Sequence, residues 1–217
     1  YNGTKVLIHY GGGSIVRTGL LERIKEALDE AGIAHIELGG VVPNPHLSKV
    51  YEGIELCRKE KIDFLLAVGG GSVIDSTKAI GYGLTNEGDV WDFFEHTRAA
   101  VCCMPLGCVL TIAAAGSEMS NSCVITKKDN NEKRGYNNDV SRPKFAIMDP
   151  ELTMTLPDYQ TACGCTDILM HTMERYFVTE TTLELTDAMA ESLLRTVIKN
   201  AHILWEDPTN YQARAEI

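Results

Sequence analysis

The sequence predicts an α/β fold: an open parallel nucleotide-binding sheet followed by an all-helical domain. Two units of the form strand, Gly-Gly-Gly-Ser, helix occur at 5–28 and 64–80. Their strands lack polar alternation, which is typical of strands buried on both faces of a parallel sheet. From Tyr159 onward, apolar residues recur at helical spacing. We therefore expect an α/β domain over residues 1–150 and the start of a helical domain over 151–217.

The first unit begins with a β-prone apolar run at 5–10, which ends at the glycine turn 11–14. A helix is expected next, because the following apolar residues are spaced by three and four: Leu20, Leu21, Ile24, Ala27 and Leu28. Gly32 fits the end of this helix, and 35–38 fits a second short strand. The loop 41–45 contains two prolines, which exclude regular structure there.

The second unit repeats this order, with an uninterrupted apolar strand at 64–68 and a glycine turn at 69–72. A glycine turn before a helix exposes backbone N–H groups at the positive end of the helix dipole, where an anion such as a pyrophosphate can bind. Neither turn completes the pattern G-x-G-x-x-G, because the position of the third glycine is occupied by Val16 in the first turn and by Ile74 in the second. A plain tight turn therefore remains the alternative for both.

Polar side chains that could meet a ligand occur at two places. Asp75 and Lys78 lie one turn apart on the helix after the second turn, and a solvated ion pair is the interpretation that their spacing favours. The small-residue stretch 111–118 would let a flat ligand approach the backbone, with Thr111 and Ser117 supplying hydroxyl groups. The alternative for this stretch is an ordinary turn.

Three further strands are expected in the middle of the chain, at 102–110, 122–126 and 145–148. The polar stretch 127–138 suits a hairpin tip or an exposed loop, and we assign it no chemistry.

The helical part contains a possible half of a metal site. Asp167 and His171 are four residues apart, so both side chains leave one face of one helix and could bind a divalent cation. Glu174 could orient the histidine. The alternative is a surface ion pair, and no other histidine has a spacing that completes the site.

Composition excludes several classes of protein. The chain has 217 residues with 20 basic and 30 acidic side chains, a net charge of −10, which gives no general attraction for nucleic acid or anionic membranes. Seven cysteines without a C-x-x-C pair predict reduced thiols and a cytoplasmic protein. No apolar run reaches the roughly 20 residues of a membrane span, and no signal peptide is expected.

Several ordered motifs together resemble the iron-containing (group III) alcohol dehydrogenases, and in particular their butanol dehydrogenase branch. These motifs are the segments 69–78, 111–118, 146–150 and 161–174. The resemblance implies a dinucleotide-binding α/β domain and a helical domain that binds a divalent metal, Fe²⁺ or Zn²⁺. It implies an oxidoreductase that transfers a hydride between a nicotinamide cofactor and an alcohol or aldehyde, with the metal polarising the substrate oxygen.

The resemblance also implies roles for individual residues. Asp75 would be a catalytic and cofactor-binding residue beside the nicotinamide, and Asp167 and His171 would be the first two metal ligands. The other residues expected to contact the cofactor are Gly70, Gly71 and Ser72 at the pyrophosphate, together with Thr111 and Lys144.

The first glycine turn bears on the choice of cofactor. NAD-preferring relatives have an Asp directly after the first strand, where this chain has Gly11. Gly12, Gly13 and Ser14 offer N–H and hydroxyl donors instead of a carboxylate, so NADP(H) is predicted to be preferred over NAD(H). Glu37, at the end of the second strand, is the contrary observation; we discount it because the family does not use that position for the ribose.

The chain departs from the family at several points. The family places two further metal-binding histidines beyond Ile217 and a strand before Tyr1, so we expect an internal fragment that has an incomplete helical domain and binds metal weakly. Ala115 stands where relatives usually have Thr, which removes a hydroxyl contact to the cofactor. A homo-oligomer, a dimer, is expected.

Two alternative functions remain open. One is a non-catalytic nucleotide-binding or assembly module, which the missing metal ligands favour. The other is a different dehydrogenase or synthase of the same superfamily, acting on glycerol or a glycerol phosphate. The second alternative requires basic groups for the substrate, and none of the residues assigned to the substrate is basic.

Overall fold

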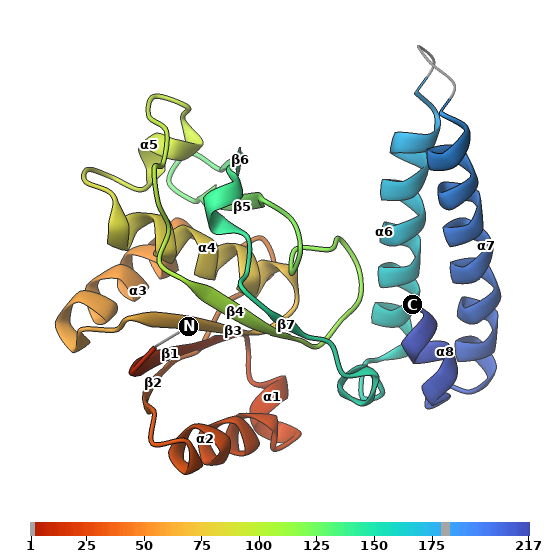
Figure 1. The fold of residues 1–217 in the computed structure, drawn as a ribbon, viewed down its shortest axis with the longest axis horizontal. Coiled ribbons are helices and arrows are strands. Elements are labelled where there is room, and N and C mark those ends of the chain that lie inside the picture. Colours follow the sequence, from red (N-terminus) through yellow and green to blue (C-terminus); the bar gives the residue numbers. More distant parts are fainter. Residues whose placement is uncertain (1–2, 179–182) are drawn as a thin grey trace. The chain divides into compact units, whose positions relative to one another are not determined.

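The computed structural model describes residues 3–178 and 183–217 of the chain, which form two compact units (Figure 1). The sheet unit comprises Tyr1–Leu110 and Ser117–Ile147, and the helical unit comprises Thr111–Gly116 and Met148–Ile217. The domain boundary expected after residue 150 stays a prediction.

The sheet unit is built on five parallel strands in the order β2-β1-β3-β4-β7. The strands are β1 (Lys5–Tyr10), β2 (Ala34–Leu38), β3 (Phe64–Gly69), β4 (Leu106–Leu110) and β7 (Ala146–Ile147). One face is covered by α1 (Ser14–Arg17) and α2 (Leu20–Glu30), and the other by α3 (Leu47–Glu60) and α4 (Gly71–Thr85) (Figure 1). The predicted fold class is confirmed.

Burial explains why these segments form strands. Every residue of β3 and of β4 is buried, as expected for central strands with helices on both faces. The main core lies where α3 and α4 pack on the sheet, and it includes the short helix α5 (Trp91–Phe94). The rings of Trp91 and Phe94 stack there with centroids 5.5 Å apart.

The strand expected at 102–110 is shorter in the structure, because β4 begins only at Leu106. Pro105 still bonds β3, since its carbonyl oxygen accepts from the Leu65 N–H at 3.0 Å, but residues 102–104 bind α4 and the residue that follows it. The Met104 N–H donates to the Gly81 carbonyl oxygen at 3.1 Å, and the Asn86 side-chain amide donates to the Cys102 carbonyl oxygen at 2.9 Å.

The strand expected at 122–126 is present as β5 (Ser122–Lys127), but it does not join the main sheet. It pairs antiparallel with β6 (Glu132–Asn137) in a separate two-stranded sheet, and the 3₁₀ turn η1 (Asp139–Ser141) follows. More than half of the polar stretch 127–138 is therefore in strands, and the hairpin tip is confined to 128–131.

The helical unit confirms the helical periodicity after Tyr159. Its elements are the 3₁₀ turn η2 (Pro150–Thr153) and the helices α6 (Asp158–Tyr176), α7 (Glu184–Glu206) and α8 (Tyr211–Glu216). The Tyr176 hydroxyl on α6 donates to Glu191 Oε1 on α7 at 3.0 Å. Within the described residues, no helix has the length and apolar character needed to cross a membrane.

A buried histidine joins three elements of the sheet unit. His9 on β1 is fully buried, with its Nδ1 2.7 Å from the Leu38 carbonyl oxygen and its Nε2 2.9 Å from Ser76 Oγ. The carbonyl can only accept, so we assign the proton to Nδ1, and Nε2 accepts from the Ser76 hydroxyl. The pKa of His9 is lowered to about 4, mainly by burial and to a smaller extent by the positive charge of Lys49. The ring is therefore neutral at physiological pH.

Acidification should destabilise the fold through His9. In the unfolded chain this side chain titrates near its ordinary pKa of 6.5, whereas in the folded chain it stays neutral until about pH 4. Its contribution is complete above pH 6.5 and is lost as the pH falls through this interval, by about 3 kcal/mol in the free energy of unfolding. Urea unfolding at a series of pH values measures the loss.

His9→Gln should unfold with a shallower pH dependence over the same interval. His202→Gln, which replaces an exposed histidine of α7, should keep the parental pH dependence. Identical pH dependence in His9→Gln and the parent chain would contradict the assignment.

Candidate functional site

The two glycine turns lie next to each other at one edge of the sheet. β1 and β3 are parallel neighbours, with Tyr10 opposite Val68, and each strand runs directly into its turn. The chain leaves β1 for β2 on one side and returns to β3 on the other, so the strand order reverses between them. Ligands of open α/β sheets bind at such a reversal, outside the carboxyl ends of the strands. The residues brought to this edge include Gly12, Gly13, Ser14, Gly70, Gly71 and Ser72.

The second turn is the better candidate for an anion site. Helix α4 has 15 residues and starts from Gly70 without a side-chain cap, so no capping side chain accepts from the N–H groups of its first turn. Helix α1 has only four residues and a correspondingly small dipole. Both turns require glycine: Gly13 has a φ of 103°, and a Cβ on Gly69 would lie 2.7 Å from Val73 Cγ2.

Asp75 lies at the end of the first turn of α4 and is held by two remote groups. Its Oδ1 accepts from the Ser117 hydroxyl at 2.7 Å, and its Oδ2 accepts from the Val124 N–H at 3.1 Å. Burial raises the pKa of Asp75, while the Ser117 hydrogen bond and the charge of Lys78 oppose this rise. The carboxylate is therefore oriented by residues more than 40 positions away in the chain.

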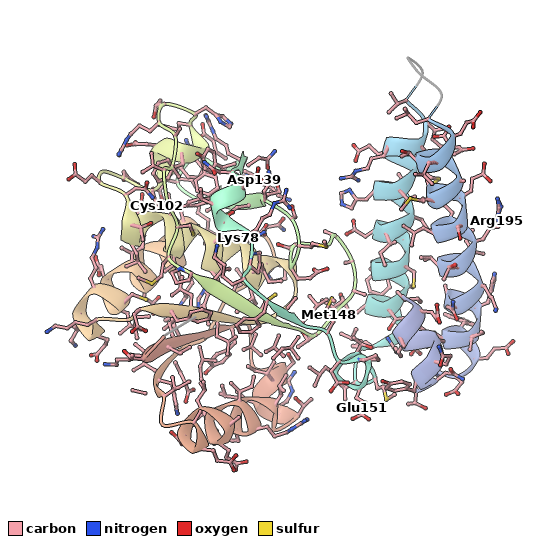
Figure 2. The ribbon with its side chains drawn as sticks, viewed as in Figure 1. Lys78, Cys102, Asp139, Met148, Glu151 and Arg195 are labelled. Atoms are coloured by element: carbon pink, nitrogen blue, oxygen red, sulfur yellow. The ribbon has the colours of Figure 1, made fainter. Side chains whose placement is uncertain are left out.

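The solvated ion pair that the spacing favoured for Asp75 and Lys78 is wrong. Lys78 is fully buried (Figure 2), and its Nζ donates to the carbonyl oxygens of Ser117, Ser120 and Ser122 at 2.8, 2.8 and 2.9 Å. Desolvation lowers the pKa of Lys78, and the nearby carboxylate of Asp75 counteracts this. Residues three apart on a helix share a face, and here that face points into the protein.

Lys133 is a basic residue near Asp75 that sequence reasoning missed. Its positive charge lowers the pKa of the Asp75 carboxyl, and its Nζ donates to Asn44 Oδ1 at 2.7 Å. The missed signal was the hairpin register, which pairs Lys133 with Thr126 on the strand that carries Val124. The segment 127–138, to which we assigned no chemistry, thus carries a cation near Asp75.

Lys144 is not brought to this group of residues. Its backbone N–H donates to the carbonyl oxygen of Leu106, the first residue of β4, at 2.7 Å. In a parallel sheet this is the amino edge, whereas the glycine turns follow the carboxyl ends. Thr111, by contrast, directly follows Leu110, whose partner on β3 is Gly69.

The predicted metal ligands are neighbours on α6. Asp167 Oδ1 and His171 Nε2 are 3.8 Å apart, Glu174 Oε2 is 3.6 Å from His171 Nδ1, and all three side chains are substantially exposed. One oxygen and one nitrogen on one helix face fit two ligands of a divalent metal. Among the described residues, no group of three or more His, Cys, Asp or Glu side chains could hold a metal ion.

These features define an α/β protein with a candidate nucleotide site at the strand ends, and comparison with known families is more specific. The model of the iron-containing alcohol dehydrogenases matches residues 1–150, and the model of the C-terminal part of the Fe-containing alcohol dehydrogenase family matches residues 161–217. The chain belongs to the iron-containing alcohol dehydrogenase family, as the motifs predicted.

Individual relatives agree with this assignment. The chain is 48% identical to the probable NADH-dependent butanol dehydrogenase 2 of Bacillus subtilis over 215 residues, 99% of this chain and 55% of the relative. It is 38% identical to the NADPH-dependent aldehyde reductase YqhD of Escherichia coli, over 98% of this chain and 55% of the relative. The crystal structure of the NADH-dependent butanol dehydrogenase A of Thermotoga maritima matches with a TM-score of 0.96 and 42% identity, over 99% of this chain and 54% of that one. The chain thus spans about half the length of these relatives.

Ser72→Asp should separate anion binding from helix stability. A carboxylate in the first turn of α4 favours the helix dipole, so thermal stability should be kept or slightly raised. The same charge repels a phosphate at that position, so the affinity for a nicotinamide dinucleotide should fall about tenfold or more, a cost of about 1.4 kcal/mol. Calorimetric titration and a thermal melt of the same sample measure the two effects.

Ser48→Asp is the matched control, because it places the same charge in the first turn of α3 on an exposed residue. It should leave dinucleotide affinity unchanged. Unaltered affinity in Ser72→Asp would show that no phosphate lies at the start of α4.

Proposed function

We propose that the protein transfers a hydride between a nicotinamide dinucleotide and a small alcohol or aldehyde. The observation that carries the proposal is the pair of glycine turns at the reversal of strand order, one of which starts a long helix without a side-chain cap. Membership of the iron-containing alcohol dehydrogenases supports the reaction class, and the relatives, named as a butanol dehydrogenase and an aldehyde reductase, indicate the substrate class, alcohols and aldehydes.

In this proposal, Gly70, Gly71 and Ser72 bind the pyrophosphate through the N–H groups at the start of α4. Asp75 lies at the end of the same turn and would face the nicotinamide end of the cofactor, oriented by its two hydrogen-bond donors. Lys133 replaces Lys144 as the basic residue of the cofactor site, because its charge acts on Asp75.

Asp167 and His171 would hold a divalent metal, Fe²⁺ or Zn²⁺, together with ligands outside the described residues. A bound divalent metal of this kind polarises the substrate oxygen as a Lewis acid. For the two side chains to bind it, His171 must present a neutral ring nitrogen and Asp167 an ionised oxygen. Their separation of 3.8 Å on one helix face supports joint ligation.

We further propose that NADP(H) is preferred, because the turn after β1 offers no carboxylate that would repel a 2′-phosphate. The carboxylate of Glu37 is already engaged, with Lys25 Nζ at 3.0 Å and the Tyr10 hydroxyl at 3.3 Å. The relatives differ in their cofactor: the butanol dehydrogenases are named as NADH-dependent and the aldehyde reductase as NADPH-dependent.

Calorimetric titration of the intact protein with NADPH and with NADH tests this function directly. Binding of either dinucleotide, weakened by Ser72→Asp, would support a dinucleotide site at α4. Tighter binding of NADPH would support the preference. Failure of both dinucleotides to bind would overturn the proposal.

Gly11→Asp should reverse the preference between the two dinucleotides. A Cβ on Gly11 would meet only the Val41 carbonyl oxygen at 3.4 Å and Val73 Cγ2 at 3.7 Å, so the side chain fits with a small adjustment. The new carboxylate should lower NADPH affinity about tenfold by repulsion and leave NADH affinity equal or higher. Titration of the variant with both dinucleotides measures the ratio, and an unchanged ratio would contradict the role given to this turn.

Asp167→Ala should abolish metal binding by the intact protein without unfolding the sheet unit. The metal content after dialysis is measured by atomic emission, and the fold by circular dichroism. Asp158→Ala is the control, because it removes an exposed carboxylate from the first turn of the same helix. Retained metal stoichiometry in Asp167→Ala would show that the ligand assignment is wrong.

A further inference from the structure

We propose that Lys78 is a positioning residue for Asp75. Its buried ammonium binds three carbonyl oxygens of the segment 117–122 and thereby fixes the positions of the two groups that donate hydrogen bonds to the Asp75 carboxylate. The proposal concerns a residue that makes no contact with the cofactor in the function proposed above. The proposal rests on the proposed function in one respect: that function gives Asp75 its place beside the cofactor.

The ammonium of Lys78 is saturated by the backbone. It has three protons, and three carbonyl oxygens of one short segment lie 2.8 to 2.9 Å from it. The segment therefore wraps around a single buried charge, in the way that a loop wraps around a bound cation. Such a charge is costly to bury unless its hydrogen bonds are complete, so the segment and the lysine order each other.

The same segment supplies the donors for Asp75. Ser117 gives its carbonyl oxygen to Lys78 and its hydroxyl to Asp75 Oδ1 at 2.7 Å. Ser122, whose carbonyl oxygen also binds Lys78, begins β5, and the Val124 N–H two residues later donates to Asp75 Oδ2. Both oxygens of the carboxylate are therefore positioned by backbone that Lys78 holds.

Few other charges act on this pair. Asp75 is influenced by Lys78 from its own helix and by Lys133 from β6. Lys78 is influenced by Asp75, by Glu118 and by the thiols of Cys108 and Cys123. Burial raises the pKa of both thiols far above neutrality, so they are uncharged. Lys78 and Lys133 thus both favour the ionised form of Asp75.

The test is the titration of Asp75 itself, followed by carboxyl ¹³C NMR in the intact protein and assigned with Asp75→Asn. Lys78→Met removes the charge and releases the segment, and it should raise the pKa of Asp75 by about 1 or more. Ser117→Ala removes one donor but keeps the backbone bonds of Lys78, and it should raise the pKa by a smaller amount.

Two controls separate positioning from general effects. Lys25→Met removes an equal charge from α2, and Ser120→Ala removes a hydroxyl of the same segment that accepts from the Ser122 N–H and does not contact Asp75. Both should leave the pKa of Asp75 unchanged. If Lys78→Met fails to fold, the proposal is tested by comparing the pKa of Asp75 in Ser117→Ala with that in Ser120→Ala.

An unchanged pKa of Asp75 in folded Lys78→Met, or equal effects of Ser117→Ala and Ser120→Ala, would overturn the proposal. Loss of the Lys78 charge by itself also raises this pKa, so positioning is supported only if Ser117→Ala, which keeps that charge, raises it as well and Ser120→Ala does not. The titration needs no bound dinucleotide, so the absence of NADPH and NADH binding would refute the proposed function and not this role of Lys78.

Discussion

The parallel pairing of β1 with β3 is the constraint on which the rest of the candidate site depends. It brings two glycine turns, far apart in the chain, to adjacent strand ends and puts the reversal of strand order between them. Each turn then feeds a helix on a different face of the sheet (Figure 1). Without this pairing, the two Gly-Gly-Gly-Ser sequences would be unrelated turns on a surface.

Helix α4 connects the edge of the sheet that carries the glycine turns with β1 and with the segment that leads into β5. It is buried on nearly all sides, and the polar groups it carries inward are satisfied by two other parts of the chain. Ser76 pairs with His9 on β1, whereas Lys78 and Asp75 both bind the segment that leads into β5. Buried polar groups of this kind specify an arrangement more than they stabilise it, because a misplaced partner leaves a charge or a donor unpaired. The start of α4 is therefore fixed in position as well as in conformation.

Much of the fold could be predicted from local patterns. Apolar runs without polar alternation identified the strands β1 and β3, and the glycine turns and the helical periodicity after Tyr159 gave the order of elements. The placement of Asp167 and His171 on one helix face also followed from their spacing alone. These features depend on residues close together in the chain, which is where sequence patterns are informative.

The remainder depended on contacts between distant segments. The sequence could not show that Lys78 points inward, because its acceptors are backbone oxygens about 40 residues away. Nor could it show that β5 pairs with β6 outside the main sheet, which brings the charge of Lys133 near Asp75. Strand pairing decides both points, and local spacing carries no information about which strands pair.

The order of strands also has a consequence for how the protein folds. β1 pairs with β2 and with β3, and the β3 partner lies almost 60 residues farther along, so the central pairing must wait for a long chain segment to close. Parallel sheets with such distant pairings fold slowly, and their unpaired apolar strands are exposed in the meantime. The apolar run of β3, which is fully buried at the end, is thus the segment most able to aggregate before β1 and β4 have enclosed it.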